Sequence, residues 1–152
     1  MKTLLIILFF CINTITASAC KCRLVSVKDE YKSSQIIVSV TVLDILSPIE
    51  KIDTITNKDG TLSVQIPVYG YSKRVLVTKR FKGNIINDTM IVAGNNSNCE
   101  LYLALGKSYL IYGNIQDNKI YTSRCSRSGL LDNHSDLKFL EKKLRRKKKN
   151  VI

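Results

Sequence analysis

The chain has few of the residues on which common enzyme sites depend. It contains one histidine, His134, which has no nearby carboxylate and cysteine arrangement of the kind used for nucleophilic catalysis. The sequence has no H-E-x-x-H, P-loop or dinucleotide-binding motif, and its acidic residues stand singly rather than in pairs suited to acid–base chemistry. We therefore expect no enzyme, no cofactor and no metal site of its own, with His134 at the surface.

The chain also lacks an apolar run long enough to span a membrane. The run Leu4–Ile12 is followed at once by polar residues, whereas a span needs about 18 apolar residues. A basic residue before this run and the small residues Ala17–Ala19 after it are typical of a secretory signal peptide. We therefore predict that residues 1–19 are a signal peptide and that the secreted protein begins at Cys20. About 133 residues would remain, which is enough for one domain and too few for two.

Loss of the signal peptide would remove Cys11 and leave an even set of cysteines, namely Cys20, Cys22, Cys99 and Cys125. In an oxidising compartment, two disulfides are the simplest account of this set. Three pairings are possible, and a bridge between Cys20 and Cys22 is the least favourable because its small ring strains the bond. Zinc binding by the four thiolates is the alternative, but the paired spacing of zinc ribbons is missing. Both long-range pairings remain open on these grounds.

The middle of the chain has the residue pattern of β-strands. Between Gln35 and Leu46, apolar residues occupy every second position, as a half-buried strand requires. They are Ile36, Val38, Val40 and Val42. Further β-rich runs lie at Leu62–Val68, Val75–Phe81, Thr89–Ala93, Ser108–Tyr112 and Lys119–Ser123. Asn57–Gly60 predicts a turn before the first of these runs, and Gly-Asn pairs at 83–84, 94–95 and 113–114 separate the later ones.

The C-terminal part of the chain predicts a basic amphipathic helix. Leu137, Leu140 and Leu144 fall at helical spacing, and Ser135 is a candidate N-cap. Five or six short strands, one helix and no internal repeat predict an all-β fold, an OB-like five- to six-stranded closed barrel with a C-terminal amphipathic helix. We assign residues 20–137 to this domain and residues 138–152 to a basic helical tail.

Several segments, taken in order, resemble the netrin-like module. They are Cys20-Lys21-Cys22, the run from Val77 to Gly83, Cys99-Glu100-Leu101, the run from Leu105 to Gly113, and Cys125 after a further strand. The layout is most similar to the N-terminal domains of tissue inhibitors of metalloproteinases, because there too a cysteine pair opens the mature protein. The resemblance covers most of residues 20 to 140. It implies an OB-like barrel whose N-terminal segment is tied to the barrel by disulfides.

By analogy with that family, Cys20 pairs with Cys99 and Cys22 pairs with Cys125. The resemblance further implies that the α-amine and carbonyl of Cys20 chelate the catalytic zinc of a target metalloproteinase. A free α-amine with a pKa near 8 is partly neutral at physiological pH and can fill the open position of such a zinc. The inhibitory edge would comprise Cys20, Lys21, Cys22 and Arg23, and the protein would act as a monomer.

The sequence departs from the inhibitor pattern at this edge. Lys21 stands where the inhibitors usually have a small hydroxyl residue that enters the main specificity pocket of the protease, so an apolar pocket would bury its unpaired charge. Arg23 and Leu24 replace the usual apolar-proline continuation. The third disulfide of the inhibitor domain and its cysteine-rich second domain are also missing.

Much of the net charge of +12 lies in the C-terminal part of the chain, which could bind a polyanionic partner. Eight basic residues lie between 138 and 149, and the candidate binding set is Lys142, Lys143, Arg145, Arg146, Lys147, Lys148 and Lys149. In a secreted protein these favour heparan-type polysaccharide or an anionic cell surface, and nucleic acid ranks last. A solvated tail is the alternative. We expect packing rather than a base-stacking platform from the strand tyrosines, which are Tyr102, Tyr109, Tyr112 and Tyr121.

A second interpretation concerns Cys20 itself. In a bacterium, Ala17-Ser18-Ala19-Cys20 approximates a lipobox, in which the cysteine is acylated on sulfur and usually on nitrogen. Ala17 departs from that motif, since the position normally carries Leu, Val or Ile. Under this alternative Cys20 neither crosslinks nor chelates zinc, and the protein is a lipoprotein, a tethered binding module.

Overall fold

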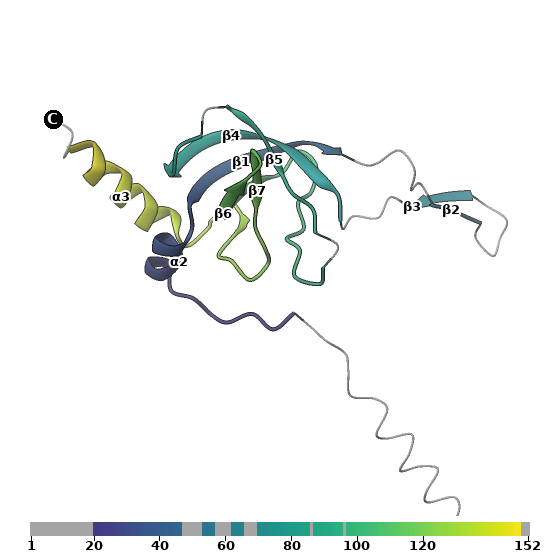
Figure 1. The fold of residues 1–152 in the computed structure, drawn as a ribbon, viewed down its shortest axis with the longest axis horizontal. Helices are drawn as coiled ribbons and strands as arrows, with labels where there is room; N and C mark the ends of the chain where they lie inside the picture. The colour runs from purple at the N-terminus through teal and green to yellow at the C-terminus, as the bar shows by residue number, and fades with distance from the viewer. Residues whose placement is uncertain are drawn as a thin grey trace, which may run out of the picture.

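The computed structural model describes residues 20–46, 53–56, 62–65, 70–85, 87–95 and 97–149, and only the backbone of 53–56, 62–65 and 148–149. Within these ranges the fold is mostly β (Figure 1). The strands are β1 Ile36–Leu46, β2 Asp53–Thr56, β3 Leu62–Gln65, β4 Ser72–Lys82, β5 Thr89–Val92, β6 Ser108–Gln116, β7 Lys119–Tyr121 and β8 Gly129–Leu130. The helices are α2 Val27–Ser33 and α3 Leu137–Lys149. The predicted signal peptide and the Asn57–Gly60 turn lie outside the described residues.

Five strands form a closed barrel. The order is β1-β4-β5-β7-β6, and β1 pairs again with β6 to close it, while β8 extends the β6 edge. All neighbouring barrel strands are antiparallel except β5 and β7, which are parallel. Register shifts along the β1–β4 ladder let the long β1 bend and pair on both sides. The predicted closed barrel with a C-terminal helix is confirmed, and β2 pairs with β3 in a separate two-stranded sheet.

The barrel interior and its outer face each have a hydrophobic cluster. Inward residues such as Val38, Val40 and Ile111 fill the barrel. The outward residues Ile37 and Leu110 form a second cluster that α3 covers with Leu140. The expected half-buried strand at 35–46 is therefore buried on both faces at Ile36 to Val40, because a helix lies on its outer side.

The boundary between β6 and β7 differs from the sequence-based prediction. The Gly113–Asn114 pair does not separate two strands but lies within β6, and the turn comes at Asp117–Asn118, which both have positive φ. Gly113 is needed inside the strand because a Cβ there would lie 2.7 Å from the carbonyl oxygen of Tyr121. Asp and Asn tolerate the left-handed conformation of the turn better than most residues.

The two helices lie together at one end of the barrel (Figure 1). Ser26 caps α2, since its Oγ accepts the Asp29 N–H at 3.2 Å and donates to the Asp29 carboxylate at 2.7 Å. The predicted Ser135 cap of α3 is wrong by one residue. The carbonyl of Asp136 accepts the Leu140 N–H, so Asp136 occupies the N-cap position. Sequence reasoning missed α2, whose seven residues carry no apolar stripe.

Candidate functional site

The segment from Cys20 to Ser26 runs beside the barrel and leads into α2 (Figure 1). Two disulfides hold it, Cys20–Cys99 with 5.3 Å between the Cα atoms and Cys22–Cys125 with 4.9 Å. This is the pairing that the family resemblance implies. The bridges are neighbours, because the Cys20 Sγ lies 3.2 Å from the Cys125 Sγ. Since every one of these sulfurs is in a disulfide, none is the thiolate that a zinc site would require.

The side chains between and after the cysteines project into solvent. Lys21, Cys22, Arg23 and Leu24 are exposed, and Leu24 is 99 % exposed. A partner that covered the Leu24 side chain would remove its apolar surface from water, and this burial would favour binding. Disulfides at both cysteines restrict the backbone of this edge, so little conformational entropy remains to be lost on binding. Of the predicted inhibitory edge, Lys21, Cys22 and Arg23 are thus exposed and Cys20 is half-buried.

A buried ion pair supports the loop that carries Cys99. The Lys73 ammonium of β4 lies 2.9 Å from the carboxylate of Glu100, and the two residues are 1 % and 4 % exposed. The second carboxylate oxygen of Glu100 accepts the Gly70 N–H at 2.6 Å. A buried charge is tolerated only when it is paired in this way. The ion pair therefore fixes the residue that directly follows Cys99.

Sequence reasoning missed this pair, although one signal was present. Lys73 shares its parity with Val75 and Val77, which places it on the inward face of β4. A lysine at an inward position requires a carboxylate partner, but the partner cannot be read from the sequence. Arg124 adds a further link, because its N–H donates to the carbonyl of Cys99 at 2.7 Å and so joins the two cysteine loops.

Arg127 connects the edge to the helical end of the barrel. Its Nη1 donates to the carbonyl of Val25 at 3.0 Å, and its Nε and Nη2 donate to the two carboxylate oxygens of Asp136 at 2.7 and 2.5 Å. The Tyr112 hydroxyl donates to the same carboxylate at 2.9 Å. A two-point arginine–carboxylate pair holds a fixed geometry. The end of the edge is therefore attached to β6 and to the start of α3 through one network.

This network shifts the pKa values of its members. Burial alone would raise the pKa of Asp136, but hydrogen bonds from Arg127 and Tyr112 outweigh burial and hold it below its ordinary value. Burial, with the hydrogen bond to Asp136 second, raises the pKa of the Tyr112 hydroxyl. The hydrogen bond to Asp136 raises the pKa of Arg127. Burial also raises the pKa of Glu30, although the charge of Arg127 opposes this effect.

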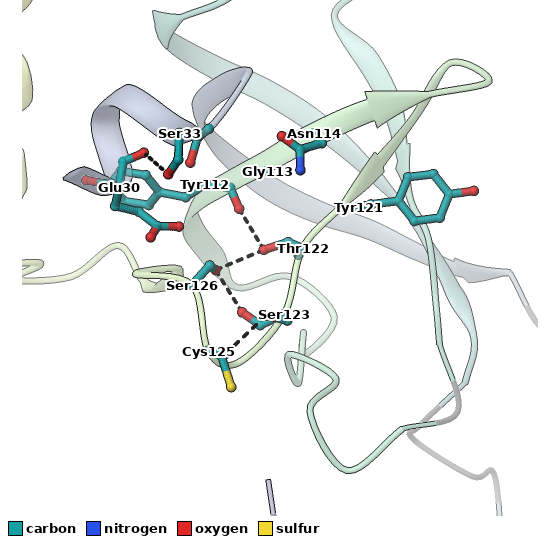
Figure 2. A pocket seen from close by; sticks show the side chains of 11 residues that line it. Glu30, Ser33, Tyr112, Gly113, Asn114, Tyr121, Thr122, Ser123, Cys125 and Ser126 are labelled. Carbon is teal, nitrogen blue, oxygen red and sulfur yellow. Dashed lines mark hydrogen bonds between the residues drawn. The ribbon is translucent and has the colours of Figure 1, made fainter. Parts of the chain in front are cut away.

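A polar hollow of about 420 Å³ lies behind the Cys125 loop (Figure 2). Three of the hydroxyl groups that line it make hydrogen bonds within the protein. Thr122 Oγ1 donates to the carbonyl of Tyr112 at 2.8 Å, Ser126 Oγ donates to that of Ser123 at 2.7 Å, and Ser123 Oγ accepts the Cys125 N–H at 3.2 Å. These bonds stabilise the turn that presents Cys125, which is a structural use of the hydroxyl groups.

Two predictions about single residues need correction. His134 is half-buried rather than a surface residue, and its Nε2 lies 2.9 Å from the carbonyl of Arg127 in the network above. Tyr109 and Tyr112 are buried as expected, but Tyr102 and Tyr121 are exposed. The Asp136 N–H, at the start of α3, donates to the Nδ1 of the same ring at 3.3 Å. The residues around His134 in the sequence do not indicate these contacts.

The predicted polyanion-binding residues lie on α3. Lys142, Lys143, Arg145, Arg146 and Lys147 are exposed, and for Lys148 and Lys149 the structure gives the backbone, which is helical. Two further lysines, Lys28 and Lys32 on α2, face the same region and were missed, because α2 itself was not predicted. Among the described residues, no helix is long and apolar enough to cross a membrane.

The fold and the crosslinks together define a class, a small disulfide-bonded protein with a closed β-barrel and a C-terminal helix. Disulfides of this kind persist in oxidising, extracellular-type environments. No protein-family model matches the chain, and no curated protein is significantly similar to it in sequence.

Proposed function

We propose that this protein is a secreted inhibitor of zinc metalloproteinases that acts through its N-terminal edge. The observation that carries the proposal is the placement of Cys20, which is crosslinked to Cys99 beside a second disulfide and followed by exposed residues. The resemblance of the cysteine layout to the inhibitors of the netrin-like group supports it. Signal peptide cleavage after Ala19 would place a free α-amine at the start of this fixed segment.

The proposed inhibition is a ligand exchange at the zinc of the target. A catalytic zinc has three protein ligands and a bound water that attacks the peptide bond. The neutral α-amine and the carbonyl oxygen of Cys20 would take the position of that water, leaving no nucleophile. Disulfides at Cys20 and Cys22 would hold both atoms in place before the protease arrives, which lowers the entropic cost of binding.

Lys21 limits the range of targets. Its side chain is exposed at the position that would enter the main specificity pocket of the protease. An apolar pocket would bury its ammonium group without a partner, whereas a carboxylate inside the pocket would pair with it. We therefore propose a target whose pocket carries an acidic group.

The test compares the protein that begins at Cys20 with a variant that has one additional alanine before Cys20. The extra residue converts the α-amine into an amide and leaves both disulfides unchanged. We expect the first protein to inhibit members of a panel of zinc metalloproteinases and the extended protein to lose that inhibition. Equal inhibition by the two would refute the mechanism, and disulfide mapping of both proteins is the control.

A second candidate function is binding to polysaccharide or to an anionic cell surface, and the exposed cations of α3 favour it. If the protein were instead a lipoprotein, Cys20 would be acylated. The Cys20–Cys99 disulfide uses the sulfur that such a lipid would need, so the two states exclude one another. Intact mass and N-terminal peptide mapping of the non-reduced protein from its native host distinguish them, and an acylated Cys20 would leave only the tethered binding module.

A further inference from the structure

A groove of about 410 Å³ runs between α2 and α3. Its charged lining is entirely cationic and consists of Lys28, Lys32, Lys142, Lys143 and Arg146. The other two lining residues are Tyr31 and Phe139. Five cations from two separate helices thus face one hollow, and none of the described residues that line it is acidic. An arrangement of this kind creates a local positive potential that attracts anions.

The two aromatic rings hold one of these cations in place. Tyr31 and Phe139 pack edge to face with 5.8 Å between the ring centroids. The Lys143 ammonium lies 5.7 Å from the Tyr31 centroid and 5.8 Å from that of Phe139, within cation–π range of both. Lys143 is therefore held over the groove before any ligand binds.

The walls of the groove are fixed to the barrel. The Lys82 ammonium of β4 donates to the carbonyls of Tyr31, Lys32 and Ser34 at 2.6, 3.0 and 2.6 Å, at the C-terminal end of α2. A cation at this end of a helix satisfies carbonyls that have no partner within the helix. On the other wall, Leu140 of α3 is fully buried in the outer cluster. Both helices are thus anchored through residues that do not line the groove.

A second hollow of about 440 Å³ lies along α3 next to the groove. The two hollows share Lys142 and Arg146, and the second adds Lys138 and Arg145. Glu141, the one acidic residue among the described residues that line this hollow, is paired with Lys79 at 2.7 Å. The cations therefore form a continuous track rather than a site for one small ion, and an extended ligand with repeated anionic groups matches it.

We propose that the groove between α2 and α3 is the central sulfate-binding site for a linear sulfated polysaccharide, with Lys28 and Lys32 of α2 completing a track that runs along α3. The proposal rests on the second candidate function and is independent of inhibition at Cys20. A membrane surface fits less well, because an interfacial helix must insert its apolar face into lipid. The apolar residues Leu137, Phe139 and Leu140 of α3 instead pack in the outer cluster.

The test titrates the full mature protein with a heparin-type octasaccharide by calorimetry at physiological salt. The Lys28→Ala/Lys32→Ala double variant should bind about tenfold more weakly, because two charged contacts are lost. The matched control is Lys107→Ala/Lys119→Ala, which removes the same charge from exposed positions on the barrel and should change affinity less than about twofold. The Lys147→Ala/Lys148→Ala/Lys149→Ala triple variant loses more charge but should lose less affinity than the α2 variant.

Each alternative result has a defined meaning. Equal affinity of the α2 variant and its control would refute the groove and leave polysaccharide binding by α3 intact, as would a larger loss in the triple variant. Absence of octasaccharide binding by the unaltered protein would refute the polysaccharide form of the second candidate function as well. Binding to phosphatidylserine vesicles without binding to the octasaccharide would identify a membrane as the partner and overturn the proposal. Circular dichroism spectra of the variants verify that the exposed substitutions leave the fold unchanged.

Discussion

The Asp136 carboxylate lies at the start of α3, where Arg127 and Tyr112 donate hydrogen bonds to it. Its pKa in the folded protein is below the ordinary value of 3.8. A lowered folded pKa means that the stabilisation is fully present above the unfolded pKa and is lost as the pH falls through the folded pKa. We expect Asp136→Asn to lower the free energy of unfolding by about 2–3 kcal/mol at pH 7, because Arg127 loses its charged partner.

The pH dependence separates this charge effect from a packing defect. The difference between Asp136→Asn and the unaltered protein should begin to shrink as the pH falls below about 4, where the carboxyl group of the unfolded chain takes up a proton, and should go on shrinking until the pH is below the lowered pKa of the folded protein. Urea unfolding at pH 7 and at pH 3 measures both values. Asp132→Asn, an exposed neighbour, is the control and should change little at either pH. A difference that stayed constant with pH would mean that geometry rather than charge makes Asp136 important.

At this scale the sequence predicts some residues well and others not at all. Four cysteines behind a predicted signal peptide are sufficient to predict two disulfides, because an even number of cysteines in an oxidising compartment usually pairs. The Glu100 partner of Lys73 cannot be predicted, because it depends on a loop position that only the folded barrel sets. His134 was misplaced for the same reason, since its contact with the Arg127 carbonyl arises from the tertiary fold.

The helix α2 depends on a residue of the barrel more than on its own sequence. With seven residues it is too short to be stable alone, and the Lys82 ammonium supplies donors to the carbonyls at its C-terminal end. We expect Lys82→Met to destabilise the protein by about 2 kcal/mol. Hydrogen exchange should also accelerate at the Ser34 amide, which donates to the Glu30 carbonyl in the last turn.

Lys107→Met is the control for that experiment, because Lys107 is exposed on the turn before β6. It should leave the exchange of the Ser34 amide unchanged. If Lys82→Met lowered global stability without changing exchange in α2, the ammonium would stabilise the barrel strand rather than the helix end.

Among the secondary structure elements, the alternation of apolar residues predicts strands and their spacing by three or four residues predicts helices. Such patterns are clearest in elements that bury one continuous apolar stripe. The runs expected for β4, β5, β6 and α3 overlap the observed elements, although β6 is buried on both faces and continues to Gln116. In α2 the only local signal is the capping pair Ser26 and Asp29, which is too common to predict a helix by itself. The predicted strand boundary at Gly113 is wrong because Gly113 is required by close packing against Tyr121. The sequence alone does not distinguish such a glycine from one required by a turn.

For the whole molecule, the two disulfides should contribute nearly equal stability. Their sequence separations are 79 and 103 residues, and the loop-closure term depends only on the logarithm of loop length. We expect Cys20→Ser/Cys99→Ser and Cys22→Ser/Cys125→Ser each to lower the free energy of unfolding by about 4 kcal/mol, with a difference between them of less than about 0.5 kcal/mol. Equilibrium unfolding in guanidinium chloride measures both pairs.

A large inequality between the two double variants would contradict the entropic account. It would mean that local contacts, such as those that Arg124 and Arg127 make near the edge, dominate the contribution of one bridge. A chain with both bridges removed tests additivity, because the two sulfur pairs are in contact and the effects of neighbouring sites need not add.

The closed barrel follows from strand number and composition, but its connectivity does not. Five short strands with turn residues between them predict a small barrel, since closure is the common way to protect the edges of such a sheet. The parallel pairing of β5 with β7 and the contact of β1 with β6 join segments far apart in the chain. No local pattern specifies such pairings, so the strand order required the structure.

The placement of the crosslinks sets an order of events during synthesis. If the chain is secreted as proposed, Cys20 and Cys22 enter the oxidising compartment first, and their partners follow 79 and 103 residues later. At about 5–20 residues per second, the first two thiols wait for roughly 5–20 s before native oxidation can begin. The strands that close the barrel, β6 and β7, emerge in the same interval. On that route Cys22 could pair with Cys125 only after β6 and β7 had been synthesised, whereas Cys20 could pair with Cys99 before them, so a disulfide isomerase should raise the yield of the native protein.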